Sequence, residues 1–172
     1  MVKSKMINFV IWVFSFLSIT SLLVVGINKP SHALSGSEFE AGRIIDDAVF
    51  FNKNALNVYN IQNFLDSKVP TCDTWGTQPY GGTTRAAYGA ANGNPAPYTC
   101  LKGYSQAVPF RAADQYCSKP VNASASSSAA GIIYDVAQAC GVNPAVLIVL
   151  LQKEQSLVTD DWPWQIQYNK AT

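Results

Sequence analysis

The hydrophobic and polar positions of the chain change pattern several times, and the first change falls near Ala33. Residues 1–33 are dominated by an apolar run over 6–27, which follows the bases Lys3 and Lys5 and precedes a small-x-Ala pattern that ends at Ala33. This is the layout of a secretory signal peptide. The run also approaches the roughly 20 residues that span a bilayer. The pattern therefore predicts either a signal cleaved after Ala33 or an uncleaved membrane anchor, and both export the rest of the chain.

Residues 34–70 have apolar side chains at helical spacing in two stretches. The first stretch, over 37–51, has acidic residues near its start, as a helix N-terminus favours. The second begins near Asn54 or Asn57, either of which is a suitable N-cap, and ends before Pro70. We expect these two helices to pack together as a small helical hairpin.

Residues 71–120 lose this periodicity and are rich in Gly, Pro, Thr, Asn and Tyr. The sequences Gly81-Gly82 and 92–95 (Asn-Gly-Asn-Pro) are typical of turns, so we expect a long irregular region. Its aromatic residues either contact sugar rings or form a satellite core beneath a disulfide. They are Trp75, Tyr80, Tyr88, Tyr98 and Tyr104.

Helical spacing returns in the last segment, residues 121–172. The small residues of 124–128 read as a spacer that leads into a helix over 126–140, which Gly141 then ends. Whether residues 34–120 form a separate module or pack on this last segment is left open by the sequence.

A second helix is predicted over residues 144–158, because Asn143 can cap it and Pro144 suits its first position. Its first half is apolar throughout, which is typical of a buried helix. At about 100° per residue, Glu154 falls on the apolar face. Burial disfavours a charged carboxylate and raises its pKa, the condition for a general acid near neutrality. The alternative is a structural Glu that reaches solvent or pairs with a base, namely Arg43, Arg85, Arg111 or Lys153.

The four cysteines all lie in the exported part: Cys72, Cys100, Cys117 and Cys140. Exported chains are oxidised, so two disulfides are expected. Three pairings are possible and the sequence does not select one, although Cys72 with Cys100 and Cys117 with Cys140 would each close a loop of moderate length. The alternative is a zinc site with four thiolate ligands, which the absence of any CxxC pair disfavours. We expect no metal and no cofactor.

The one histidine, His32, lies in the signal or anchor segment. The exported part therefore cannot by itself supply Ser-His-Asp, Cys-His or His-ligated zinc chemistry, which leaves carboxylate chemistry or binding. Removal of residues 1–33 would also take away three lysines and no acidic residue, so the exported part is weakly acidic. A weakly acidic domain has no basic field for nucleic acid.

The segment from Gly141 to Glu154, Gly-Val-Asn-Pro-Ala-Val-Leu-Ile-Val-Leu-Leu-Gln-Lys-Glu, resembles the entry to the catalytic helix of soluble lytic transglycosylases and goose-type lysozymes. In that family a Gly-Val-Asp-Pro-like turn opens a buried helix, and the catalytic Glu follows the Pro by ten residues, as Glu154 follows Pro144. The resemblance covers about residues 126–158. It departs from the family at Gln155, where the family usually has Ser directly after the Glu.

The resemblance implies a mainly α fold, with a partial lysozyme-like helical lobe preceded by the helical hairpin and the irregular disulfide-tied region. Because most of the family's lobe follows the catalytic helix, we expect the chain to hold its first half and the reading frame to continue beyond Thr172. The implied activity is cleavage of peptidoglycan glycan strands, with Glu154 as acid and base. Transglycosylases need no second carboxylate, whereas a hydrolase would use Asp160 or Asp161. Substrate-binding residues would be Trp162, Trp164 and Tyr168.

Two other functions are compatible with the sequence. One is a non-enzymatic secreted protein that binds peptidoglycan or another cell-surface glycan through the aromatic region. The other is an inhibitor or adhesin built on the helical unit of residues 37–68. In each case the membrane is a partner only if the N-terminal segment stays uncleaved.

Overall fold

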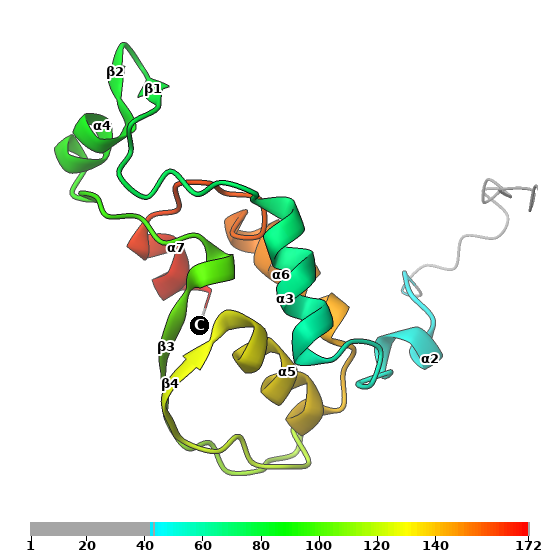
Figure 1. Cartoon of the computed structure of the whole chain (residues 1–172). Helices are drawn as coiled ribbons and strands as arrows, with labels where there is room; N and C mark the ends of the chain where they lie inside the picture. The colour runs from blue at the N-terminus through cyan, green and yellow to red at the C-terminus, as the bar shows by residue number, and fades with distance from the viewer. Residues whose placement is uncertain (1–41, 43, 172) are drawn as a thin grey trace, which may run out of the picture. The chain divides into compact units, whose positions relative to one another are not determined.

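The computed structural model describes Gly42 and residues 44–171, and its elements belong to one compact unit that begins at Ile44. The predicted signal or anchor and residues 37–41 of the first predicted helix lie outside the described residues. The described part is mainly helical, with two short antiparallel hairpins (Figure 1). In chain order the elements are α2 (Asp47–Phe50), α3 (Val58–Lys68), β1 (Pro79–Tyr80), β2 (Thr83–Thr84), α4 (Arg85–Ala91), the 3-10 helix η2 (Leu101–Gly103), β3 (Ser105–Val108), β4 (Ser124–Ser128), α5 (Ala129–Cys140), α6 (Pro144–Gln155) and α7 (Gln165–Lys170).

The predicted helix ends are confirmed where a local signal marks them. Asn57 caps α3: its side chain accepts a hydrogen bond from the Asn60 N–H at 2.9 Å, and the Asn60 side chain returns the contact. Asn143 caps α6 through the Ala145 N–H, with Pro144 in the first turn. Gly141 ends α5 in the left-handed conformation, at φ 72°, which glycine adopts without steric cost.

Three helices start or stop elsewhere than predicted. The first predicted helix is helical only over Asp47–Phe50 among the described residues, because Asp46 is extended and begins the helix. Helix α5 starts at Ala129, since residues 124–128 pair with β3 as strand β4 instead of forming a spacer. Helix α6 stops at Gln155, three residues early, because Ser156 adopts a left-handed φ of 59° and its N–H bonds to Gln152.

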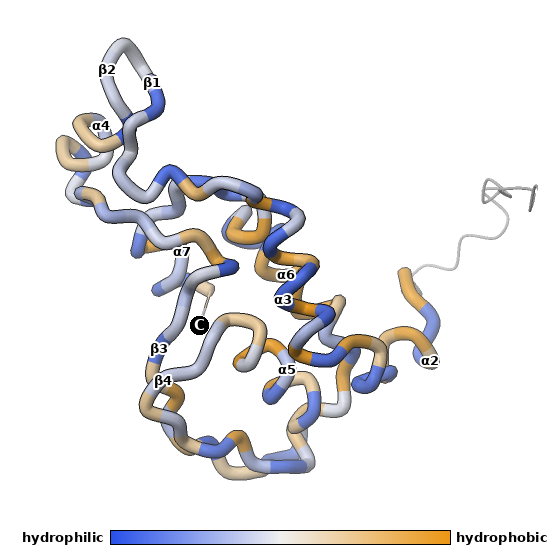
Figure 2. The backbone as a smooth tube through the Cα atoms, in the orientation of Figure 1, coloured by the Kyte–Doolittle hydropathy of each residue, from blue (hydrophilic) through white to orange (hydrophobic). Residues whose placement is uncertain are grey.

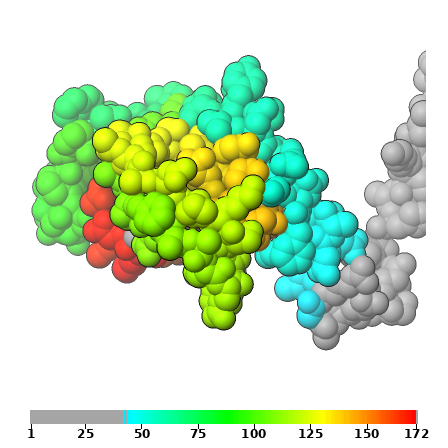
Figure 3. Space-filling view, turned by 90° about the horizontal axis from the view of Figure 1, so that it is seen from below, coloured from blue at the N-terminus to red at the C-terminus, as the bar shows by residue number. Residues whose placement is uncertain are grey.

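The two hairpins stabilise the region that was predicted to be irregular. Strands β1 and β2 are joined by Gly81 and Gly82, whose φ values of 58° and 82° require glycine. Strand β3 pairs with β4 in antiparallel register, with Ser105 opposite Ser128. The loop between β3 and β4 projects from the body, as the yellow-green atoms in Figure 3 show. Helix α4, which the sequence analysis did not anticipate, follows β2 directly.

The core lies where α3, α5 and α6 meet, and Figure 2 shows apolar stretches on these three helices. Leu157 and Val158 are both buried in it. They were predicted to extend α6, but the turn at Ser156 carries them into the core instead. The buried members are Ile61, Leu65, Leu101, Ala129, Ala130, Ile133, Ile148, Leu157, Val158 and Tyr168.

The four cysteines form two disulfides, as expected, and the structure selects one pairing. Cys72 is bonded to Cys100 and Cys117 to Cys140, with sequence separations of 28 and 23 residues. Two disulfides indicate an oxidising, extracytoplasmic compartment. Among residues 44–171, no helix is long and apolar enough to cross a membrane. Nor do the described residues contain a group of three His, Cys, Asp or Glu side chains able to hold a metal ion.

Candidate functional site

Glu154 lies near the end of α6 with its carboxylate in solvent, which corrects the prediction that it is buried. Its side chain is 59% exposed, and Oε1 lies 3.4 Å from Nζ of Lys153. The predicted burial assumed that Leu157 and Val158 would flank Glu154 on the same helix. Because α6 ends before them, Leu157 and Val158 do not flank Glu154, and its carboxylate stays in solvent. Pairing with Lys153 was one of the alternatives that the sequence left open.

A mainly apolar hollow of about 280 Å³ lies beside Glu154, between α5 and α6. The side chains that face it include Val136 of α5 and Leu147 and Leu150 of α6, and Glu154 and Lys170 are its charged residues. A ligand in this hollow would meet the Glu154 carboxylate from an apolar side.

The two candidates for a second carboxylate are held by other groups. Asp160 accepts hydrogen bonds from the Trp162 N–H at 3.0 Å and from the Gln167 side chain at 2.9 Å. Asp161 is paired with Arg85, at 2.9 Å. Both acids therefore hold the turn between α6 and α7 in place.

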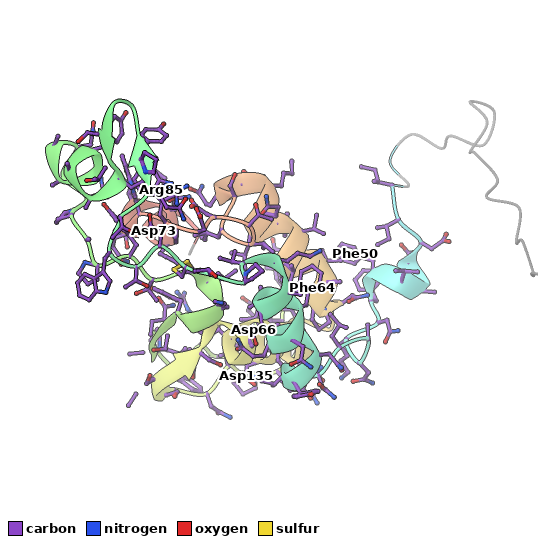
Figure 4. All side chains as sticks on the ribbon, turned by 45° about the horizontal axis from the view of Figure 1, so that its top comes forward. Phe50, Phe64, Asp66, Asp73, Arg85 and Asp135 are labelled. Carbon is purple, nitrogen blue, oxygen red and sulfur yellow. A yellow bond between two sulfur atoms is a disulfide. The ribbon has the colours of Figure 1, made fainter. Side chains whose placement is uncertain are left out.

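A buried charge cluster, which sequence reasoning missed, lies in the disulfide-tied region. The Asp73 side chain is 4% exposed and is 3.4 Å from Nη1 of Arg85, whose same nitrogen contacts Asp161. Figure 4 shows Asp73 and Arg85 close together. Asp73 also accepts hydrogen bonds from the N–H groups of Thr77 and Gln78, at 2.8 and 3.1 Å, and from the Thr77 hydroxyl at 3.1 Å.

These contacts fix the charge states of the cluster. Burial alone would raise the pKa of Asp73, but the backbone hydrogen bonds from Gln78 and Thr77, together with Arg85, outweigh it and hold that pKa below its ordinary value. For Arg85, burial opposes the charge, and the contacts with Asp161 and Asp73 outweigh it and raise the pKa. Burial, followed by the charge of Asp73, raises the pKa of Tyr98. The cluster is therefore one cation between two anions.

Five aromatic rings form a contact network next to this charge cluster, and we call them the ring cluster: Tyr80, Tyr88, Tyr98, Trp162 and Trp164. The Arg85 guanidinium lies over the Trp162 ring, 5.0 Å from its centroid, within the range of cation–π attraction. Trp162 also contacts Tyr80, Tyr98 and Trp164, with centroid separations of 5.2, 5.7 and 5.7 Å. Tyr88 contacts both Tyr80 and Trp164, at 4.8 and 6.3 Å.

The structure thus brings two of the predicted substrate-binding residues together and places the third elsewhere. Trp162 and Trp164 join the tyrosines of the loop region, and Tyr80 stays 46% exposed. Tyr168 is buried in the core, where it stacks on Tyr104 with centroids 3.9 Å apart. Its hydroxyl donates to the Thr99 carbonyl at 2.7 Å, and burial raises its pKa.

One feature of the sequence could have indicated the charge cluster that sequence analysis missed. Asp73 and Arg85 are the two charged residues between positions 71 and 100. Opposite charges isolated in a long stretch of Gly, Pro and Tyr are more easily buried as a pair than separately. Asp161, the third member, gives no such signal because it lies far away in the sequence.

The chain was also compared with known proteins. No protein-family model matches it, and no curated protein or solved structure does either.

Proposed function

We propose that this protein is exported and binds a glycan of the cell wall through its ring cluster. The observation that carries the proposal is the contact network of five aromatic rings, in which Trp162 packs against a fixed arginine and Tyr80 remains half exposed. The apolar C–H face of a sugar ring packs well on an aromatic face, while its hydroxyl groups stay hydrated or hydrogen-bonded. Two disulfides support the extracytoplasmic location that such a ligand requires.

The way the ring cluster is held favours binding. Trp162 is fixed by Arg85, and Arg85 is fixed by Asp73 and Asp161. Rings that are already ordered lose little conformational freedom when a ligand binds, so more of the contact energy appears as affinity. The charge cluster carries one positive and two negative groups, which disfavours a polyanionic ligand.

Cosedimentation with insoluble peptidoglycan tests this proposal. We expect Tyr80→Ala and Trp164→Ala each to weaken retention about tenfold, which corresponds to roughly 1.4 kcal/mol. Tyr116→Ala is the matched control, because Tyr116 is an exposed tyrosine outside the ring cluster. Far-ultraviolet circular dichroism, which reports the backbone, checks that each variant is folded. Retention of both ring variants at the wild-type level would contradict the proposal.

Cleavage of the glycan by Glu154 is a second candidate, favoured by one specific observation. Glu154 follows Pro144 by ten residues on a helix that is capped and begins where the sequence predicted, and its carboxylate is open to a ligand beside an apolar hollow. In this candidate the carboxylate would protonate the glycosidic oxygen once a bound sugar had displaced the water around it.

Release of soluble fragments from purified peptidoglycan separates the two candidates. If Glu154 is the acid, Glu154→Gln abolishes release and leaves wall retention unchanged, whereas the control Asp135→Asn, at another exposed carboxylate, releases fragments normally. If wild-type protein is retained on the wall and releases no fragments, cleavage is rejected and binding remains.

A further inference from the structure

A second hollow is lined in part by Tyr98 and Tyr104, and we call it the proline–tyrosine hollow. Its volume is about 360 Å³, within the range of about 300–1,000 Å³ that ligand sites occupy. Pro95, Pro97 and Pro163 give it apolar walls, together with tyrosines. All of its lining residues are described, and none of them carries a charge.

The hollow has fixed walls. The Tyr98 hydroxyl donates to the Asn94 carbonyl at 2.9 Å, and the Tyr168 hydroxyl donates to the Thr99 carbonyl at 2.7 Å. Tyr104 stacks on Tyr168. The disulfide at Cys100 lies next to Thr99 in the chain and closes the loop that carries the hollow. A hollow with such walls is formed before any ligand arrives.

The polar groups of the hollow suit a neutral ligand rich in hydroxyl groups. Within the described part of the chain, the hydroxyls of Thr99 and Ser105 have no hydrogen-bond partner, and both residues are exposed. Hydroxyl groups can donate or accept, so they pair with sugar hydroxyls in either sense. An anionic ligand would find no cation among the lining residues.

The hollow and the ring cluster share a wall. The Tyr98 ring packs edge-on against Trp162, 5.7 Å between centroids, and also lines the hollow. Pro163 lies between Trp162 and Trp164 in the chain and lines the hollow as well. We propose that the proline–tyrosine hollow is a subsite for a neutral saccharide, next to the ring cluster and separated from it by the buried Tyr98 ring. This inference rests on the proposed glycan-binding function.

Gly103 allows the hollow to be blocked without disturbing the fold. It lines the hollow, and a Cβ built on it meets no atom within 4 Å. Gly103→Leu therefore places an apolar side chain in the space that the sugar would take. Ala107→Leu is the matched control, because Ala107 is an exposed residue of the neighbouring strand β3 that does not line the hollow.

The test is a calorimetric titration with the neutral probes chitohexaose, cellohexaose and maltohexaose, and with the anionic probe hexagalacturonate. We expect wild type and Ala107→Leu to bind at least one neutral probe with equal Kd, Gly103→Leu to bind it at least tenfold more weakly, and hexagalacturonate not to bind. An unchanged Kd for Gly103→Leu, or equal affinity for hexagalacturonate, would overturn the inference.

Peptidoglycan cosedimentation of the same variants separates this inference from the proposed function. If Trp164→Ala loses retention while Gly103→Leu keeps both its retention and its Kd for the neutral probe, the hollow is not a subsite and the proposed function stands. If wild type neither sediments with the wall nor binds any neutral probe, the proposed function and the subsite both fail.

Discussion

Two carboxylates in this molecule have the opposite solvent exposure to the one that their local sequences suggest. Glu154 lies near the end of a largely apolar helix and yet is in solvent, whereas Asp73 lies in a Gly-, Pro- and Tyr-rich segment and is buried. Asp73 is buried because Arg85 and two backbone N–H groups compensate its charge. The comparison shows that a charge is buried where a counter-charge and hydrogen-bond donors surround it, and that helical periodicity alone does not bury it.

The same contrast holds for the two regions around these residues. The region that carries Asp73 has little regular structure, but a disulfide, a charge cluster and the ring cluster hold it together. The helical region around Glu154 leaves Val149 and Leu150 of α6 exposed beside an apolar hollow. A region with little regular structure can therefore be held tightly by its side chains, while part of a regular helix stays exposed.

Removal of one disulfide should have the largest effect on stability. Its effect on wall binding should distinguish the two regions. A double Cys72→Ala, Cys100→Ala variant is expected to lose about 3.5 kcal/mol of unfolding free energy, from the loop it closes. It should also lose wall binding, because Asp73 and Tyr98 flank this disulfide. Urea denaturation and cosedimentation measure the two effects.

The matched variant Cys117→Ala, Cys140→Ala opens a loop of similar length, so its loss of stability should be similar. That disulfide lies away from the ring cluster in the sequence, so wall binding should persist below the denaturation midpoint. Equal loss of binding in both variants would remove the distinction between the two regions.

Asp73→Asn should cost nearly as much stability as loss of a disulfide. The amide keeps one acceptor but presents an NH₂ group toward Arg85 and the Gln78 N–H, and leaves the Arg85 charge less compensated. We expect a loss of about 3 kcal/mol in urea denaturation. The control Asp66→Asn changes a carboxylate on the exposed face of α3 and should leave the midpoint unchanged. Equal denaturation midpoints for the two variants would show that the buried charge cluster adds nothing to stability.

Lowering the pH should test the same Asp73 carboxylate, with a smaller effect on the unfolding free energy than the Asp73→Asn substitution. The pKa of Asp73 is lowered in the folded protein, so its contribution to stability is complete above the unfolded pKa of about 3.9. That contribution is lost as the pH falls from there through the lowered folded pKa. The unfolding free energy of wild type should therefore fall more steeply below pH 4 than that of Asp73→Asn. Parallel pH profiles for the two proteins would contradict this assignment.

Glu154→Gln should have the smallest effect on stability. Its carboxylate is exposed, and it pairs with Lys153, itself an exposed side chain. Such surface pairs contribute little, so the change in unfolding free energy should stay within about 0.5 kcal/mol. A larger loss in thermal or urea denaturation would mean that Glu154 makes a structural contact after all.

The parts of the fold that the sequence predicted are those with local causes. Asn57, Asn143 and Gly141 mark helix ends through hydrogen bonds and backbone angles set within a few residues. The Gly81-Gly82 turn was predicted for the same reason. The cysteine count predicted two disulfides, and their pairing came from the structure.

The parts that the sequence did not predict depend on distant partners. Residues 124–128 form a strand because β3 lies beside them, and small serines alone gave no sign of it. Serine has no strong preference for the left-handed conformation, so the early end of α6 at Ser156 had no local signal. The wrong prediction that Glu154 is buried followed from the wrong prediction of this helix end. For the candidate site, Trp162 and Trp164 were identified, whereas Asp73 and Arg85 were not.

The hydrogen bond between Gln78 and Asp161 joins residues 83 positions apart, and the one between Tyr168 and Thr99 spans 69. A chain is synthesised from its N-terminus, so Tyr80 and Arg85 leave the ribosome well before Trp162 and Asp161 exist. Until then the early segment has no late segment to pack on, and contacts of such long range form slowly. The ring cluster that we propose binds glycan can therefore form only after synthesis has passed Trp164.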